Sequence, residues 1–426
     1  MDNKNGMAGA FAKARQATAV GLFALTLAVF PTFAATGVSP VPLDPGDGNT
    51  YDLYVGAQEQ YDDNLYRLPT GDNVVATLVA PNASRSDRIS TASAGGDGQW
   101  LVGRQLFDAD LRVDESRFAR NGTLNNTSGL AKLLWDWEVG PYFSGTAGAN
   151  YSHGLASFGE TLYLGRDFIN VKDYFGTARY QMGPHWAIYG GVDDSSVAHS
   201  ALPAESQDFK TQAAHTGVEY ALDTANTFNF DYRFDQGRFH QGQVSTLNGS
   251  TFDPNFHDST LLFTATHAFS DKTQVVADVG YLKRYYPNTV IGSFGGYIWR
   301  VTANYQPTDK TNIAFAGWHE LHAYLVSQSD YYISEGGSVT PTWSPTDKFT
   351  VKFVGSYERQ AYIPASVLVL GPITANVRAE SLNFSYQPRE HWQLTLAYAH
   401  SARQSDSPVF RYSDNLASFS ILYIIH

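Results

Sequence analysis

Hydrophobic and polar residues alternate along most of the chain, in runs that predict β-strands. Residues 227–235 read Thr-Phe-Asn-Phe-Asp-Tyr-Arg-Phe-Asp. Successive side chains of a strand point to opposite faces, so this run has one aromatic face and one polar, charged face. A soluble sandwich would bury the aromatic face beneath a second sheet, whereas a membrane barrel turns it toward lipid and keeps the polar face in water.

The length of the runs favours the membrane barrel. A strand of about 12 residues, at roughly 3.3 Å per residue and tilted by about 45°, covers roughly 28 Å, which is enough to cross the hydrocarbon layer. Strands of soluble sandwiches usually have about five or six residues. Aromatic residues also recur beside the connections between runs, as expected of an interfacial girdle.

A short turn recurs in three similar copies near the C-terminal end, at residues 306–310, 344–348 and 387–391. Each copy follows an aromatic residue, contains a Pro with charged residues, and leads directly into a new alternating run. This composition favours tight β-hairpin turns. The turns alternate with longer connections, and in bacterial barrels short turns face the periplasm while long loops face outward.

These patterns predict an all-β chain that forms a transmembrane antiparallel up-and-down β-barrel over residues 51–426. We expect 18 strands, with 16 as the alternative count. The expected strands are residues 51–63, 87–101, 106–119, 129–138, 142–154, 170–181, 185–197, 209–221, 226–238, 256–268, 273–286, 294–306, 311–323, 332–343, 348–359, 377–387, 392–404 and 413–426.

The first 34 residues predict a secretory signal peptide. A basic start precedes an apolar stretch at residues 17–30, and Thr32-Phe33-Ala34 offers a small-x-small site for cleavage after Ala34. Residues 35–50 are rich in Pro and Gly and predict a flexible periplasmic segment. Together these features predict export to the outer membrane of a Gram-negative cell.

Composition excludes several classes of partner. The net charge of −12 argues against a nucleic acid as a partner. The chain has no cysteine, which excludes disulfides and thiolate metal sites. We expect no cofactor.

The alternation assigns a set of charged residues to the inner, water-facing side of the barrel. Charges are costly on the lipid face, so each of these residues either solvates the wall or tunes selectivity. Acids outnumber bases among them, so we expect a pore that does not favour polyanions. The lumen-lining candidates are Asp108, Asp110, Arg112, Asp114, Lys132, Asp136, Glu138, Asp231, Arg233, Asp235, Asp278, Arg300, Lys352 and Glu358.

Two sequence patterns resemble metal-binding motifs but lack features that those motifs require. Asp108, Asp110 and Asp114 lack the Gly and the terminal Glu of a calcium loop. His319 and His322 are three residues apart, which places them on opposite faces of a strand. We therefore expect no metal site. No spacing singles out a catalytic serine, histidine and acid, so we expect no enzyme activity.

The segment Tyr61–Pro69 is the most distinctive part of the chain. It reads Tyr-Asp-Asp-Asn-Leu-Tyr-Arg-Leu-Pro, and Ser86-Asp87, residues 103–105 and residues 134–137 follow it. With them it resembles the EpsL-like family of β-barrel porins encoded in exopolysaccharide operons. The resemblance implies a role in exopolysaccharide export, with a periplasmic polysaccharide export protein and an inner-membrane copolymerase as partners. It implies no catalytic residues.

Four polar residues of this segment, Asp62, Asp63, Asn64 and Arg67, end the first expected strand and enter the longest expected loop. We expect them at the outer mouth of the barrel. There they either fold the loop back as a constriction, through pairing of Asp with Arg and a turn begun by Asn, or simply close the loop.

The function that we expect from the sequence is passive passage of a secreted polysaccharide through a polar lumen. The alternatives are a general or small-solute porin, a barrel enzyme that modifies polysaccharide or lipid, and a scaffold with a sealed lumen. Besides the export partners, we expect contacts with outer-membrane lipid and the outer-membrane assembly machinery. The chain ends in His426 rather than in the aromatic residue usual at this position.

Overall fold

The computed structural model describes residues 49–69, 79, 83–159, 163–240, 243–244, 251–252, 255–287, 293–323, 329–364 and 373–426. The expected signal peptide of residues 1–34, its cleavage after Ala34, and all but the last two residues of the 35–50 segment lie outside these ranges. Within the described residues, no helix is long and apolar enough to cross a membrane.

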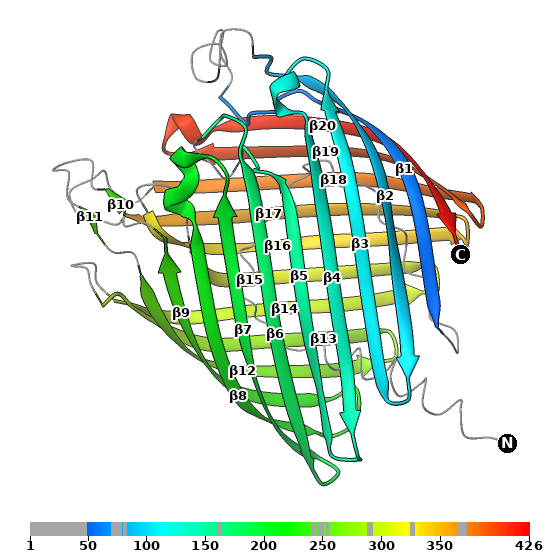
Figure 1. Cartoon of the computed structure of the whole chain (residues 1–426). Helices are drawn as coiled ribbons and strands as arrows, with labels where there is room; N and C mark the ends of the chain where they lie inside the picture. Colours follow the sequence, from blue (N-terminus) through cyan, green and yellow to red (C-terminus); the bar gives the residue numbers. More distant parts are fainter. Residues whose placement is uncertain are drawn as a thin grey trace.

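Eighteen antiparallel strands form one sheet that closes on itself (Figure 1). Closure occurs because the first strand, β1 (Thr50–Asp62), pairs with the last, β20 (Tyr412–Ile425), over ten residues of β1 from Leu53 to Asp62. Every other barrel strand pairs with its neighbours along the chain. The predicted 18-stranded up-and-down barrel is confirmed.

The strands between these two follow the expected ranges closely. A hairpin of two short strands, β10 (Gln243–Val244) and β11 (Thr251–Phe252), stands apart from the barrel in the connection between β9 and β12. The other barrel strands are β2 (Asp87–Val102), β3 (Gln105–Phe118), β4 (Asn126–Val139), β5 (Phe143–Leu155), β6 (Phe168–Met182), β7 (Trp186–His199), β8 (Phe209–Ala221), β9 (Thr227–Phe239), β12 (Phe256–Ser270), β13 (Thr273–Tyr285), β14 (Phe294–Thr308), β15 (Thr311–Ala323), β16 (Ser329–Thr346), β17 (Phe349–Pro364), β18 (Ile373–Arg389) and β19 (Trp392–Ser405).

Among the described residues, three short 3-10 helices lie in the connections at the opposite end from the tight turns: η1 (Gly122–Leu124), η2 (Leu202–Gln207) and η3 (Pro408–Phe410). The C-terminus lies at the end with the tight turns (Figure 1). Because bacterial barrels keep their short turns and termini in the periplasm, we call this the periplasmic end and the other the extracellular end.

The repeated turn sequence has a structural explanation. In each of three successive turns a Lys ammonium donates a hydrogen bond to the Pro carbonyl oxygen of the next turn. The N–O distances are 3.1 Å from Lys272 to Pro307, 2.8 Å from Lys310 to Pro345 and 3.2 Å from Lys348 to Pro388. The turns therefore form a connected ladder along the periplasmic rim.

The outer wall is apolar over most of its height. On β9 the outward side chains Phe230, Tyr232 and Phe234 are 56%, 44% and 42% exposed, whereas the inward Asp235 is 1% exposed. Near the periplasmic turns, aromatic rings of neighbouring strands contact one another, as with Trp186 and Tyr220, whose ring centroids are 4.7 Å apart. An exposed apolar wall with an aromatic rim is stable only in a lipid bilayer.

Candidate functional site: the inner wall and the outer mouth

The inner wall at the N-terminal side of the barrel carries a row of charges across four strands. In the register of the sheet, Asp52 of β1 lies opposite Asp97 of β2, Asp97 lies opposite Asp110 of β3, and Asp110 lies opposite Lys132 of β4. Like charges directly opposite one another destabilise a sheet. We call Asp52, Asp97 and Asp110 the acidic row.

Two members of the acidic row, Asp97 and Asp110, are partly exposed to the lumen, whereas Asp52 is buried. The side chain of Asp110 is 28% exposed and that of Lys132 is 54% exposed, and their charged atoms are 4.0 Å apart. The neighbouring Asp108 accepts a hydrogen bond of 3.2 Å from the Gln99 amide. Further along the wall, Asp136 accepts one of 2.7 Å from the Thr146 hydroxyl.

Arginines on the inner wall are held by acids on the same strand or on nearby strands. The Arg112 guanidinium lies 2.8 Å from the Asp114 carboxylate. Arg233 bridges Asp193 of β7 at 3.0 Å and Asp235 of its own strand at 2.9 Å. These bridges neutralise part of the acidic charge.

On the opposite side of the barrel, three further lumen-lining candidates take part in ion pairs or hydrogen bonds. Arg300 of β14 donates two hydrogen bonds of 2.7 Å to Glu320 of β15, which the sequence did not single out. Asp278 accepts a hydrogen bond of 2.6 Å from Thr264, and Glu358 accepts one of 2.6 Å from Ser334.

The three remaining candidates differ in exposure: Asp231 is largely buried, whereas Lys352 and Glu138 are accessible. Asp231 lies 3.1 Å from the His215 ring nitrogen. Lys352 of β17 is exposed on the inner face, opposite Asn383 of β18. Glu138, near the periplasmic turns, pairs with the Arg104 guanidinium in a half-exposed contact.

Sequence reasoning missed the most deeply buried ion pair, between Asp258 of β12 and Arg284 of β13. Both side chains are 0% exposed, and Arg284 donates hydrogen bonds of 2.8 and 2.6 Å to the two carboxylate oxygens. The guanidinium carbon also lies 3.7 Å from the centre of the Phe256 ring. Inward parity was visible in the sequence, but the register that brings the two residues opposite each other was not.

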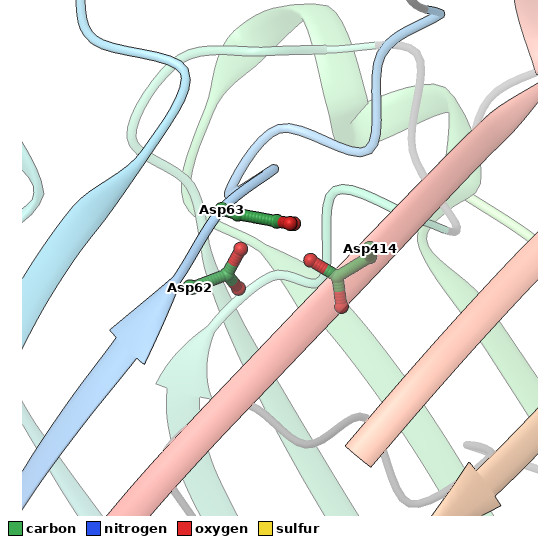
Figure 2. A group of neighbouring side chains, drawn as sticks. All are labelled: Asp62, Asp63 and Asp414. Carbon is green, nitrogen blue, oxygen red and sulfur yellow. The ribbon is translucent and has the colours of Figure 1, made fainter. Parts of the chain in front are cut away.

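Asp62, Asp63, Asn64 and Arg67, the residues expected at the outer mouth, join the first and last strands where the barrel closes. We call them the outer-mouth motif and the contact they make a clasp. Figure 2 shows Asp62 and Asp63 at the end of β1 facing Asp414 on β20. Arg67 Nη1 lies 3.0 Å from the Asp62 carboxylate and 2.8 Å from that of Asp414. It also donates a hydrogen bond of 2.7 Å to the Asn64 carbonyl. One guanidinium thus joins the first and last strands.

The other motif residues extend this clasp. Asp63 accepts hydrogen bonds of 2.8 and 2.7 Å from the backbone and side-chain nitrogens of Asn415, and Asn64 Nδ2 donates one of 2.9 Å to the Ser413 carbonyl. Arg67 is the one described non-glycine residue with a positive φ, at 53°. The expected pairing of Asp with Arg and the Asn turn are therefore present.

The chain beyond the clasp packs against the inner side of the extracellular end. Leu65, Tyr66 and Leu68 are buried with Ile89 of β2 and Phe118 of β3. Burial raises the pKa of Tyr66 to about 12, with a smaller effect from the Asp87 carboxylate. The segment therefore lies against the inner side of the wall at this end, next to the seam that its polar residues close.

The three acids of the clasp have carboxylate oxygens within 4.8 Å of one another, a spacing that suits a metal ion. Here, however, the Arg67 guanidinium lies among them and contacts two of the three. The third, Asp63, is satisfied by Asn415. The charge that a cation would supply is provided by the chain itself.

A second clasp joins the same two strands at the periplasmic end. The ring of His426, the terminal residue, lies 2.6 Å from the Asp52 carboxylate of β1. His391 Nδ1 donates a hydrogen bond of 2.9 Å to the Ile424 carbonyl, and its ring centroid is 5.4 Å from that of His426. His426 thus stabilises the seam through polar contacts.

The hydrogen bond to Asp52 raises the pKa of His426 above its usual value. The charged His426 ring therefore contributes its full stabilising free energy to the seam below the ordinary histidine pKa of about 6.5. This contribution is lost as the pH rises through the higher pKa of His426 in the folded protein. We expect amide hydrogen exchange at the periplasmic end of β20, corrected for intrinsic rates, to accelerate over that range. The variant His426→Gln should show no such pH step, and an identical step in both proteins would contradict the assignment.

The closed sheet, the lipid-facing outer wall and the charged inner wall define the chain as a transmembrane β-barrel of the Gram-negative outer membrane. No protein-family model and no curated protein matches it.

Among solved structures, the chain is similar to a BenF-like porin from Pseudomonas fluorescens Pf-5, with a TM-score of 0.50 and 10% identity over 88% of this chain and 99% of that one. It also matches Pseudomonas aeruginosa OccK2 (OpdF) in complex with glucuronate, with a TM-score of 0.48 and 8% identity over 89% and 98% of the two chains. For Pseudomonas aeruginosa OprD the TM-score is 0.45, with 10% identity over 88% and 95%. The first likeness shows a shared porin barrel fold.

Proposed function

We propose that this barrel is a passive outer-membrane channel for small polar solutes and that it prefers cations to anions. The observation that carries the proposal is the acidic row on the inner wall, where neighbouring strands place carboxylates directly opposite one another. Such an arrangement lowers the stability of the sheet, so a benefit to permeation is the simplest reason for it. Charged rings of one sign are a common basis of ion selectivity in pores.

The position of the acidic row along the inner wall supports the same proposal. The acidic row is partly exposed, whereas many charges near the extracellular mouth are buried in ion pairs such as that of Asp258 and Arg284. A solute passing the row therefore meets carboxylates that are only partly neutralised, by Lys132 at 4.0 Å from Asp110 and by His426 at 2.6 Å from Asp52. In this proposal the Leu65 to Leu68 segment, packed on the inner side of the wall, acts as a constriction that favours small solutes over bulky ones.

Ion selectivity in a planar bilayer tests the proposal. We expect the wild-type protein to pass potassium more readily than chloride, read from the reversal potential in a salt gradient. Replacing Asp97 and Asp110 by Asn removes two wall charges worth about 1 kcal/mol to a passing ion, so the preference should fall roughly fivefold.

The matched control is Lys352→Gln, which removes a positive charge from the inner wall on the other side of the barrel. It should shift the reversal potential in the opposite direction. Equal permeability to both ions in the wild type, or a shift of the same sign in both variants, would contradict the proposal, and zero conductance would support a sealed scaffold instead.

The second candidate is a conduit for exopolysaccharide, with the export protein and copolymerase as partners. Its support is the resemblance of the Tyr61–Pro69 segment to the EpsL-like family, together with the position of that segment at the extracellular mouth. Deleting the gene distinguishes the two candidates. Loss of surface polysaccharide favours the conduit, while intact polysaccharide with reduced uptake of small cationic solutes favours the porin.

A further inference from the structure

The outer wall changes character toward the extracellular end. On β1 the outward residues Leu53 and Val55, near the periplasmic end, give way to Glu59 near the other end. On β3 the apolar Leu111 is likewise followed by the outward Arg117. Above the apolar band, the lipid-facing side of the barrel therefore has a polar zone.

Tyrosines mark the boundary between the two zones. Their rings face outward beside the apolar band, and their hydroxyls donate hydrogen bonds of 3.1, 3.0 and 2.7 Å to Asn side chains. A ring in apolar surroundings with its hydroxyl in a polar layer is typical of the membrane interface. The pairs are Tyr151 with Asn170, Tyr357 with Asn376 and Tyr398 with Asn415.

At the edge of the polar zone, four adjacent strands present a row of basic residues. In the register, Lys172 of β6 lies opposite Ser196 of β7, Ser196 lies opposite Lys210 of β8, and Lys210 lies opposite Arg238 of β9. All three bases are exposed and share the outward parity of apolar residues on their strands, such as Phe234 of β9. We call Lys172, Lys210 and Arg238 the basic row.

The positive charge of this row is only partly neutralised by the described residues. Lys210 lies 2.8 Å from the Asp194 carboxylate. Arg238 donates a hydrogen bond of 2.9 Å to the neutral Gln236 side chain, and Lys172 has no ion pair among the described residues. Lys210 and Arg238 face each other directly, which destabilises the sheet unless an anion lies between them. The net charge of the whole chain is −12, so the basic row is a positively charged surface on a negatively charged protein.

We propose that the basic row binds the phosphate groups of outer-leaflet glycolipid. The row faces away from the lumen and begins at the tyrosine boundary, since Lys172 lies opposite Tyr151 in the register, so it meets the headgroup layer. Strands lie about 4.8 Å apart, so the row extends over roughly 14 Å, a span suited to a headgroup with more than one phosphate. Lysine and arginine bind phosphate through charge-assisted hydrogen bonds, and the Ser196 hydroxyl between two bases adds a further donor.

The test measures binding of bisphosphorylated lipid A, and of its dephosphorylated form, to the purified full chain in detergent. We expect the wild type to prefer the phosphorylated lipid. Replacing all three bases of the row by Gln should weaken that binding by on the order of 100-fold, since each base near an anionic headgroup contributes about 1 kcal/mol. Binding to the dephosphorylated lipid should not change.

The matched control replaces Lys272, Lys310 and Lys348 of the periplasmic turns by Gln, which removes the same charge at the other end of the barrel. It should bind lipid A like the wild type. Should the row variant fail to fold, the wild type still tests the proposal, because binding through exposed charges must weaken as salt rises from about 0.05 to about 0.5 M.

Three outcomes would overturn the proposal: equal binding of both lipid forms, equal loss in both triple variants, or wild-type binding that salt does not change. Cross-linking of the row to a second copy of the chain, without a lipid effect, would also overturn it by assigning the surface to self-association. The result is independent of the selectivity measurement, since no residue of the row faces the lumen.

Discussion

Replacing Arg284 by Met should lower the free energy of unfolding by about 3–5 kcal/mol, because it leaves a buried carboxylate without its counterion. Asp258 and Arg284 are both 0% exposed and are joined by two hydrogen bonds. The substitution also removes the contact of the Arg284 guanidinium with the Phe256 ring. Equilibrium urea unfolding of the barrel folded in lipid vesicles measures the change, and a midpoint close to that of the wild type would contradict it.

Two further variants isolate the cause of this effect. The double variant Arg284→Met with Asp258→Leu removes both charges, so it should recover most of the stability, as hydrophobic replacement of buried ion pairs often does. The variant Arg117→Met breaks the exposed pair of Arg117 with Glu115, whose side chains are 65% and 39% exposed. It should cost less than about 1 kcal/mol. A similar loss in Arg117→Met and Arg284→Met would show that burial is not the cause.

Replacing Arg67 by Ala should open the extracellular end of the barrel seam. The change leaves the buried carboxylates of Asp62 and Asp414, 3% and 4% exposed, without their shared guanidinium, at a cost of about 3 kcal/mol. Because those carboxylates belong to the first and last strands, the weakening should be local. Amide hydrogen exchange should accelerate near Asp62 and Asp414 while exchange in β8 and β9 stays unchanged.

Two comparisons separate charge from backbone conformation at this position. Arg67→Lys keeps the positive charge but loses the forked geometry, so it should fall between Ala and the wild type. Arg67→Gly relieves the positive φ of 53° yet removes the guanidinium, so it should still accelerate exchange. Unchanged exchange at the seam in Arg67→Ala would show that backbone pairing of β1 with β20 alone holds the barrel closed.

Local patterns determined much of this architecture. A side-chain period of two is visible without knowledge of any partner strand, which is why the alternation of Phe230, Asp231 and Tyr232 predicted a lipid face and a water face. The predicted strands were too short mainly at extracellular ends. Strand β18 begins at Ile373 rather than at residue 377, because the alternation there is inverted, with the polar Thr374 and Asn376 on the outward face.

Tertiary structure decided which charges meet. Register depends on turn geometry and on closure, so the sequence did not reveal that Asp97 lies opposite Asp110 or that Arg284 reaches Asp258. The roles of Arg67 and Asp414 required the pairing of strands 347 residues apart along the chain. The composition and the alternation of apolar and polar residues thus determined that this chain forms a barrel with a polar, water-accessible interior. Closure of the sheet decided where its interior charges cancel and where they remain open to water, because only closure brings the first and last strands together.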